Sequence, residues 1–97
     1  MKKKPIILIG SGGHAKACID VIENEAKFYI YGIIDNKKKG ELLGYPIIGK
    51  DQDLIKYLKK VKDLLIAVGQ IRDNKIRPKL YKFGKSLGYK FPKIISK

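Results

Sequence analysis

The sequence contains very little cysteine and histidine, and its hydrophobic runs are short. Cys18 and His14 are the only residues of their kinds among 97, which excludes an internal disulfide and a zinc site made of Cys and His ligands. The clearest apolar runs, residues 6–9 and 64–68, are far shorter than the ~20 residues that a membrane-spanning helix needs. Residues 1–4 are basic like the start of a signal peptide, but ~7–15 apolar residues would have to follow. We therefore expect a cytoplasmic chain without a membrane partner.

Arginine is also scarce, and this affects how the strong positive charge is interpreted. The formal net charge is +13, which attracts polyanions such as nucleic acid. Only Arg72 and Arg77 among the 22 basic residues are arginines, however, and specific recognition of bases and phosphates favours the two-pronged guanidinium. The lysines are spread along the chain, with short runs at residues 2–4 and 37–39. We expect a solvated, lysine-rich surface and no nucleic-acid partner, and a basic nucleic-acid-binding module remains an alternative.

Alternating strand and helix patterns predict a single α/β domain. A chain of 97 residues, 44% of them hydrophobic, can bury one modest core, so we expect one domain over residues 1–97. Runs rich in apolar, β-branched and aromatic residues predict strands at residues 5–9, 28–34, 45–49, 64–68 and 91–95. Proline places 45–49 at an edge of the sheet, and residues 37–44 are expected to form a loop. This order is typical of an α/β fold with a small, mostly parallel sheet.

Three helices are predicted from apolar stripes with helical spacing. The first follows a glycine-rich turn, Asp51 is the predicted N-cap of the second, and Pro78 belongs in the first turn of the third. Gly88 is expected to end the third helix. The residues predicted to be buried are Ala15, Cys18, Ile19, Ile22 and Ala26 in the first helix, Leu54, Ile55, Leu58 and Val61 in the second, and Ile76, Leu80, Phe83 and Leu87 in the third.

The turn after the first strand matches the G-x-G-x-x-G/A pattern at Gly10, Gly12 and Ala15. In that pattern the first glycine makes the tight turn, the second lets the backbone approach a phosphate, and the small third residue keeps the helix close to the sheet. The helix N-terminus also presents free N–H groups and the positive end of the helix dipole. We therefore expect this turn, with Ser11 and Gly13 in it, to bind a diphosphate.

Further candidate residues are expected around the same crevice. His14 begins the first helix, and its position beside the glycine turn predicts a hydrogen bond to phosphate. Asp35 and Asn36 end the second strand, where the carboxyl ends of parallel strands border one crevice; an ordinary Asp-Asn turn is an equal alternative. Gly69 and Gln70 follow the strand at residues 64–68 and are expected to form a third side of the crevice. Arg72, just beyond them, is a candidate for pairing with phosphate, although an ordinary surface arginine is the default.

The sequence offers a place to hold a nucleotide and no recognisable catalytic machinery. No Walker lysine follows the glycines, and no pair of acids, nucleophile–base pair or metal-ligand cluster is visible. From the residues alone, an NAD(P)-type dinucleotide-binding domain stays open, because Gly10, Gly12, Ala15 and Asp35 also fit that kind of ligand.

Several linked motifs resemble those of one known family. They are residues 7–16 (ILIGSGGHAK), 32–36 (GIIDN), 44–49 (GYPIIG), 67–72 (AVGQIR) and 87–92 (LGYKFP). Together they resemble the N-terminal domain of the PglD/NeuD-like sugar O- and N-acetyltransferases, and the similarity covers essentially the whole chain. The resemblance implies a Rossmann-like, three-layer domain that holds a UDP-linked amino sugar for surface-glycan synthesis in bacteria.

The resemblance also implies a second domain that residues 1–97 do not contain. In the family, a C-terminal left-handed β-helix binds the co-substrate acetyl-CoA, forms a homotrimer and supplies the histidine that deprotonates the acceptor. We therefore expect the chain alone to bind no cofactor, to be a monomer or weak oligomer, and to be inactive. Carried onto this sequence, the resemblance implies that Gly12, Gly13 and His14 contact the diphosphate-sugar, that Asp35 and Asn36 contact the uridine side, and that Gly69 and Gln70 line the pocket.

Overall fold

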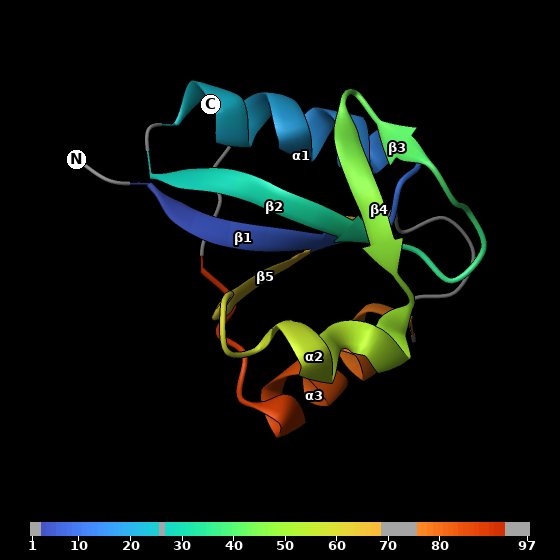
Figure 1. Ribbon diagram of the computed structural model, residues 1–97, viewed down its shortest axis with the longest axis vertical. Helices are drawn as coiled ribbons and strands as arrows, with labels where there is room; N and C mark the ends of the chain where they lie inside the picture. Colours follow the sequence, from blue (N-terminus) through green and yellow to red (C-terminus); the bar gives the residue numbers. More distant parts are fainter. Residues whose placement is uncertain (1–2, 26, 69–75, 93–97) are drawn as a thin grey trace.

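Five strands form one sheet in the order β3-β4-β2-β1-β5 (Figure 1). The structure is a computed structural model that describes residues 3–25, 27–68 and 76–92. In the middle of the sheet, β1 (Lys4–Ile9) pairs in parallel with both β2 (Phe28–Ile34) and β5 (Asp63–Ile66). On the other side of β2, β4 (Tyr45–Gly49) continues the parallel pairing, and β3 (Glu41–Leu42) runs antiparallel to β4. The mostly parallel sheet predicted from the sequence is confirmed.

Helices cover both faces of this sheet (Figure 1). One face carries α1 (Gly13–Asn24). The other carries α3 (Ile76–Leu87) and the short helix α2 (Leu54–Tyr57), which continues the 3-10 turn η1 (Asp51–Asp53). These three layers confirm the predicted α/β fold class. In the part of the chain that the structure describes, no helix is both long and apolar enough to cross a bilayer.

β1 contributes to two separate cores, because successive side chains of a strand point to opposite faces. Ile6 and Leu8 pack in a cluster with Ala15, Ile19 and Ile22 of α1. Ile7 and Ile9 point to the other face. There they pack in a second cluster with the buried residues Leu54, Val61, Leu64 and Tyr89. Since each fully buried aliphatic side chain contributes about 1.5–3 kcal/mol, the double burial of β1 fixes the middle of the sheet.

The edge of the sheet differs from the prediction, because residues 37–44 contain β3 rather than only a loop. Leu43 (φ 51°) and Gly44 (φ 88°) both have a left-handed backbone, and they form a two-residue turn between β3 and β4. The predicted edge position of β4 is therefore wrong. Pro46 is tolerated in β4 because the pairing of this strand with β2 begins only at Ile47.

The second helix also begins differently from the prediction. The N-cap of η1 is Lys50 rather than Asp51, and the Lys50 N–H donates to Oδ2 of Asp53 at 2.9 Å. The tighter 3-10 turn has about 3.0 residues per turn, which shifts the apolar stripe relative to an α-helix that starts at the same place. As a result Leu54 is buried as predicted, whereas Ile55 is 59% exposed.

The predicted buried stripe of α3 is only partly correct. Ile76 and Phe83 are 46% and 38% exposed, and the buried position of the helix is Gly84. A Cβ added to Gly84 would lie 2.7 Å from Cζ of Phe91 and 3.0 Å from Cδ1 of Leu64. The helix therefore packs through Gly84 together with the partly buried Leu80 and Leu87, and a glycine adds nothing to an apolar pattern.

The predicted ends of α3 are confirmed, and the strand predicted after it is not observed as such. Pro78 lies in the first turn of α3, and Gly88 follows its last residue with a φ of 104°. Residues 91 and 92, the described part of 91–95, form no strand, and Lys90 makes an isolated parallel bridge beside β5, to Asp63. Ala26 and residues 93–95 lie outside the described residues.

Substitution of Tyr89 tests the link between the chain after α3 and the start of α2. Its buried hydroxyl donates to the carbonyl oxygen of Leu54 at 2.5 Å, so Tyr89→Phe leaves that carbonyl without its partner. We expect the free energy of unfolding, measured with urea, to fall by about 1–3 kcal/mol. Tyr29→Phe is the control, because Tyr29 is 47% exposed and its substitution is expected to cost less than about 0.5 kcal/mol.

The same tyrosine predicts a loss of stability in alkali. Burial, with a smaller effect of Tyr57, raises the pKa of Tyr89 to about 12 from 10.0. A raised pKa means that the neutral hydroxyl stabilises the fold below pH 10.0 and that this contribution disappears as the pH rises towards 12. The difference in stability between wild type and Tyr89→Phe should shrink over that range, and a constant difference would contradict this assignment.

Candidate functional site

The turn between β1 and α1 is crowded on one side and open on the other. Gly10 has a φ of 110°, and a Cβ there would lie 2.8 Å from Cγ1 of Val68. At the other end of the turn, Gly12 is the N-cap of α1, and no described side chain caps this helix. A Cβ added to Gly12 or Gly13 would meet no described atom within 4 Å. The turn is therefore open around Gly12 and Gly13 in the described residues, and the first N–H groups of α1 have no side-chain cap there, which suits an anion.

Ser11 fastens this turn to the end of β2. Its side chain is almost fully buried, and its Oγ donates to Oδ2 of Asp35 at 2.5 Å. The other carboxylate oxygen of Asp35 accepts the backbone N–H groups of Lys37 at 2.8 Å and Lys38 at 2.9 Å. Both oxygens of Asp35 are therefore used within the protein.

These contacts also determine the charge of Asp35. Partial burial alone would raise the pKa of its carboxyl group, but the hydrogen bonds from Ser11 and from the N–H groups of Lys38 and Lys37 outweigh it. The pKa of Asp35 consequently lies below the ordinary value of 3.8. At neutral pH Asp35 is a carboxylate that accepts hydrogen bonds and holds the turn in place.

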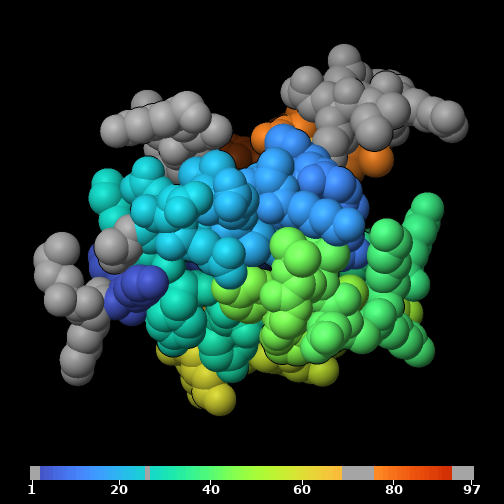
Figure 2. Space-filling view, turned by 90° about the horizontal axis from the view of Figure 1, so that it is seen from above, coloured from blue at the N-terminus to red at the C-terminus, as the bar shows by residue number. Residues whose placement is uncertain are grey.

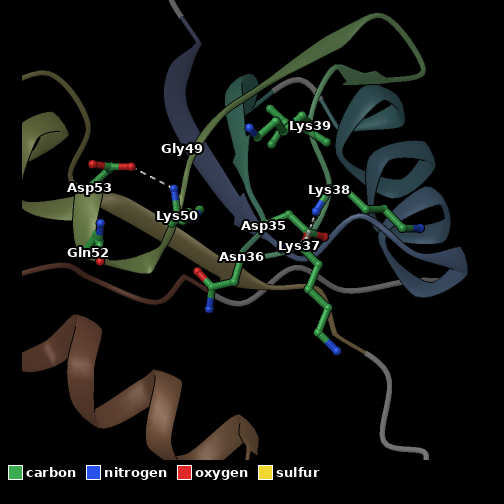
Figure 3. Close-up of a pocket in the computed structure, with 10 residues that line it drawn as sticks. Asp35, Asn36, Lys37, Lys38, Lys39, Gly49, Lys50, Gln52 and Asp53 are labelled. Atoms are coloured by element: carbon green, nitrogen blue, oxygen red, sulfur yellow. Dashed lines mark hydrogen bonds between the residues drawn. The ribbon is translucent and has the colours of Figure 1, made fainter.

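A pocket of about 340 Å³, here called the Asp35 pocket, opens beside the ends of β2 and β4 (Figure 3). Its lining includes Asp35 and four lysines. Figure 3 shows the side chains of Lys37, Lys38 and Lys39 leaving the loop after β2 in different directions. The lysines therefore make the rim positive, but they do not converge on one point.

Asn36, which also lines the Asp35 pocket, is held by Asp51. Nδ2 of Asn36 donates to Oδ2 of Asp51, and Oδ1 of Asn36 accepts the backbone N–H of Asp51, both at 2.9 Å. This reciprocal pair joins the end of β2 to η1. The amide of Asn36 thus has a structural partner at each end.

His14 lies in a different depression, here called the His14 hollow, of about 450 Å³. It is bordered by α1, by Leu65 and Ile66 of β5, and by Arg77 at the start of α3. Figure 2 looks down on α1 and shows its start, in blue, beside the orange start of α3. His14 is exposed, whereas Cys18 is half-buried in the α1 core, and burial raises the pKa of its thiol against the opposing charge of Arg77.

The structure brings some of the predicted site residues together and separates others. Gly10, Ser11, Gly12 and Gly13 form the turn, and Ser11 connects it directly to Asp35. His14 lines the His14 hollow, whereas Asp35 and Asn36 line the separate Asp35 pocket. Ala15 is fully buried against the sheet, as predicted. The other three candidates, Gly69, Gln70 and Arg72, lie outside the described residues.

The sequence analysis missed residues that reach the site from later elements. Arg77 was considered only as one of two scarce arginines, yet it lines the His14 hollow. Lys50 and Gln52 line the Asp35 pocket from the end of β4 and from η1. No local motif marks these positions, because they approach the crevice only after the sheet has formed.

The charge and the uncapped helix N-terminus of the described residues can hold an anionic ligand. Among the described residues there is no group of three His, Cys, Asp or Glu side chains that could hold a metal ion. A parallel sheet whose first strand leads through a glycine turn to an open helix N-terminus defines an α/β domain of the Rossmann-like class.

The chain belongs to a specific family within this class. The model of the PglD N-terminal domain family matches residues 5–83, which is most of the sequence. This result confirms the resemblance noted in the sequence. No curated protein sequence gives a significant match to the chain.

Solved structures of sugar acetyltransferases share the fold. A perosamine N-acetyltransferase from Caulobacter crescentus, in complex with CoA and GDP-perosamine, is 28% identical with a TM-score of 0.84 over 94% of this chain and 42% of its own. The acetyltransferase domain of PglB from Neisseria gonorrhoeae, in complex with acetyl coenzyme A, is 27% identical with a TM-score of 0.74 over 92% and 42% of the two chains. This chain thus spans less than half the length of either protein. UDP-D-quinovosamine 4-dehydrogenase from Vibrio fischeri, 20% identical with a TM-score of 0.65 over 93% and 76% of the two chains, shares the fold alone.

Removal of the Ser11 hydroxyl tests how the glycine turn is held. In Ser11→Ala the carboxylate of Asp35 loses its side-chain donor, and hydrogen bonds to charged groups contribute about 1.5–3 kcal/mol. We expect the free energy of unfolding at pH 7 to fall by about this amount. Because the pKa of Asp35 is lowered, its contribution is present above 3.8 and disappears as the pH falls through the folded-state value, so the effect should fade in acid.

Ser86→Ala is the matched control for this prediction. Its Oγ donates to the carbonyl oxygen of Phe83 on the exposed side of α3, so its loss should cost less than about 0.5 kcal/mol at any pH. Equal losses for Ser11→Ala and Ser86→Ala, or a Ser11→Ala loss that does not change with pH, would argue against the contact with Asp35.

Proposed function

We propose that this chain is the sugar-nucleotide-binding domain of a bacterial sugar acetyltransferase. The observation that carries the proposal is the open N-terminus of α1 behind the glycine turn, in a chain 28% identical to a protein solved with GDP-perosamine and CoA. Free N–H groups and the positive helix dipole suit a diphosphate, which UDP- and GDP-linked sugars share.

In this proposal the two sides of the turn receive different parts of the ligand. The N–H groups from Gly12 and Gly13 onward, together with the exposed His14, bind the diphosphate. The Asp35 pocket, with Asp35 and Asn36 on its wall, receives the nucleoside. We assign a UDP-linked amino sugar as the ligand, with a GDP-linked one as the alternative.

Catalysis is assigned to a part of the enzyme outside these residues. The described residues show no group of three His, Cys, Asp or Glu side chains that could hold a metal ion, and the solved relatives are more than twice as long as the stretch that matches this chain. Residues 1–97 would then form one cytoplasmic binding domain, inactive alone, that positions the sugar. A β-helix domain would supply acetyl-CoA binding, the base and the trimer contacts for surface-glycan synthesis.

A dinucleotide ligand fits the same turn less well. In NAD-binding domains a carboxylate at the end of the second strand accepts hydrogen bonds from the ribose hydroxyls. Here Ser11, Lys37 and Lys38 already donate to both oxygens of Asp35. These three donors leave about one of the roughly four acceptor positions of the carboxylate, so a ribose diol that donates both hydroxyls would have to displace a donor, and we expect UDP to bind more tightly than NADH.

The variant Gly13→Ala separates binding from stability. The added Cβ meets no described atom, and alanine is a better helix former than glycine, so the fold should be as stable or more stable. The Cα–Cβ bond of a helix tilts towards the N-terminus, where the diphosphate is expected. We expect calorimetry to give an affinity for UDP at least about tenfold weaker than wild type.

Asn24→Ala, at the opposite end of α1, is the control and should leave the affinity for UDP unchanged. NADH and GDP are titrated in parallel to identify the ligand class. Tight binding of NADH without UDP or GDP would refute the proposed function in favour of a dinucleotide domain, and so would equal affinities of Gly13→Ala and wild type for UDP.

A further inference from the structure

Arg77 is anchored at the carboxyl end of the sheet, although it belongs to α3. It is the second residue of that helix and is half-buried. Its Nη1 donates to the carbonyl oxygen of Val68, just beyond the end of β5, at 2.8 Å. The carboxyl ends of parallel strands are where ligands of such sheets bind. Arg77 thus differs from the many surface lysines in having a fixed position on this edge.

The anchor point of Arg77 is in direct contact with the glycine turn. A Cβ on Gly10 would lie 2.8 Å from Cγ1 of Val68 and 3.1 Å from the carbonyl oxygen of Ala67. Gly10 is therefore pressed against the same residue whose carbonyl oxygen holds the guanidinium. A short series of contacts, from Gly10 to Val68 to Arg77, fixes the arginine relative to the turn.

Arg77 also faces α1 across the His14 hollow. His14 and Arg77 both line this depression, and the positive charge of Arg77 opposes the effect of burial on the pKa of Cys18 in α1. Asp20 lines the hollow as well, but it forms no ion pair with Arg77, because the one ion pair among the described residues joins Lys56 and Asp53. The two nitrogen-bearing side chains therefore approach the same space from opposite elements.

We propose that Arg77 is a diphosphate-binding residue that donates from the β5 side to the ligand held at the N-terminus of α1. The inference rests on the proposed function and adds a residue to its site. A guanidinium has five N–H donors in a planar fork, so it can keep its contact with Val68 and still donate to phosphate oxygens. Lysine carries three donors on one ammonium at the end of a flexible stem, so it lacks the rigid planar fork that fixes both contacts.

The test compares ligands that differ only in their phosphates. Uridine, UMP and UDP are titrated into wild type, Arg77→Gln and Arg77→Lys, and inorganic pyrophosphate is titrated separately. We expect Arg77→Gln to weaken UDP about tenfold or more, to weaken UMP less, and to change uridine less than about twofold. Arg77→Lys keeps the charge and loses the fork, so its affinity for UDP should be intermediate.

The matched control is Lys79→Gln, which removes one exposed positive charge from the same turn of α3. It should change the affinity for UDP less than about twofold. If Arg77 only supported the fold, both Arg77 variants would weaken all three uridine ligands by the same factor, and that result would overturn the inference. If pyrophosphate binding depends on Arg77 while uridine adds nothing to affinity, the diphosphate role stands and the proposed sugar-nucleotide function fails.

Discussion

The contact between Ser11 and Asp35 joins the two halves of the crevice, and the geometry of the site depends on it. A glycine turn is intrinsically flexible, because glycine loses more conformational freedom on folding than any other residue. Here the buried Ser11 donates to a carboxylate that also orders the loop after β2 by accepting the N–H groups of Lys37 and Lys38. One ionised group therefore holds both the start of α1 and the wall of the Asp35 pocket. A site that must be rigid in the free protein requires such a support, because ordering it during binding would reduce affinity.

Much of the fold could be predicted from the sequence, because the central strands are determined by local pattern. Residues 28–34 and 45–49 coincide with β2 and β4, and the strong apolar run near the start becomes β1 with side chains buried on both faces. The sequence-based predictions failed where an element depends on a partner strand or packs through a residue without a side chain. β3 exists only as one arm of a hairpin with β4, and α3 packs partly through Gly84, which carries no apolar signal. Likewise, the exposure of Ile55 follows from the 3-10 start at η1.

The candidate site was less predictable than the fold, and the reason is tertiary. The glycine turn is a local motif, and its open side at Gly12 and Gly13 is what that motif requires. Asp35 and Asn36 lie at the expected edge, but nothing in the sequence indicates that their polar atoms are bonded to Ser11, to backbone N–H groups and to Asp51. Arg77 is five residues beyond Arg72 and on a helix, and only the packing of α3 beneath the sheet brings it to Val68. Sequence motifs thus locate the phosphate side of such a crevice better than its other walls.

These internal bonds have a consequence for ligand selectivity under the proposed function. Recognition of a base requires donors and acceptors that remain available, since a site rejects the wrong ligand by leaving such groups unpaired. The side chains of Asp35 and Asn36 are already paired within the protein, whereas the first backbone N–H groups of α1 have no side-chain cap among the described residues. We therefore expect the site to select its ligand by the diphosphate more than by the nucleobase. A domain built in this way can serve acetyltransferases that use different nucleotides, and a relative solved with GDP-perosamine is compatible with a UDP-linked ligand here.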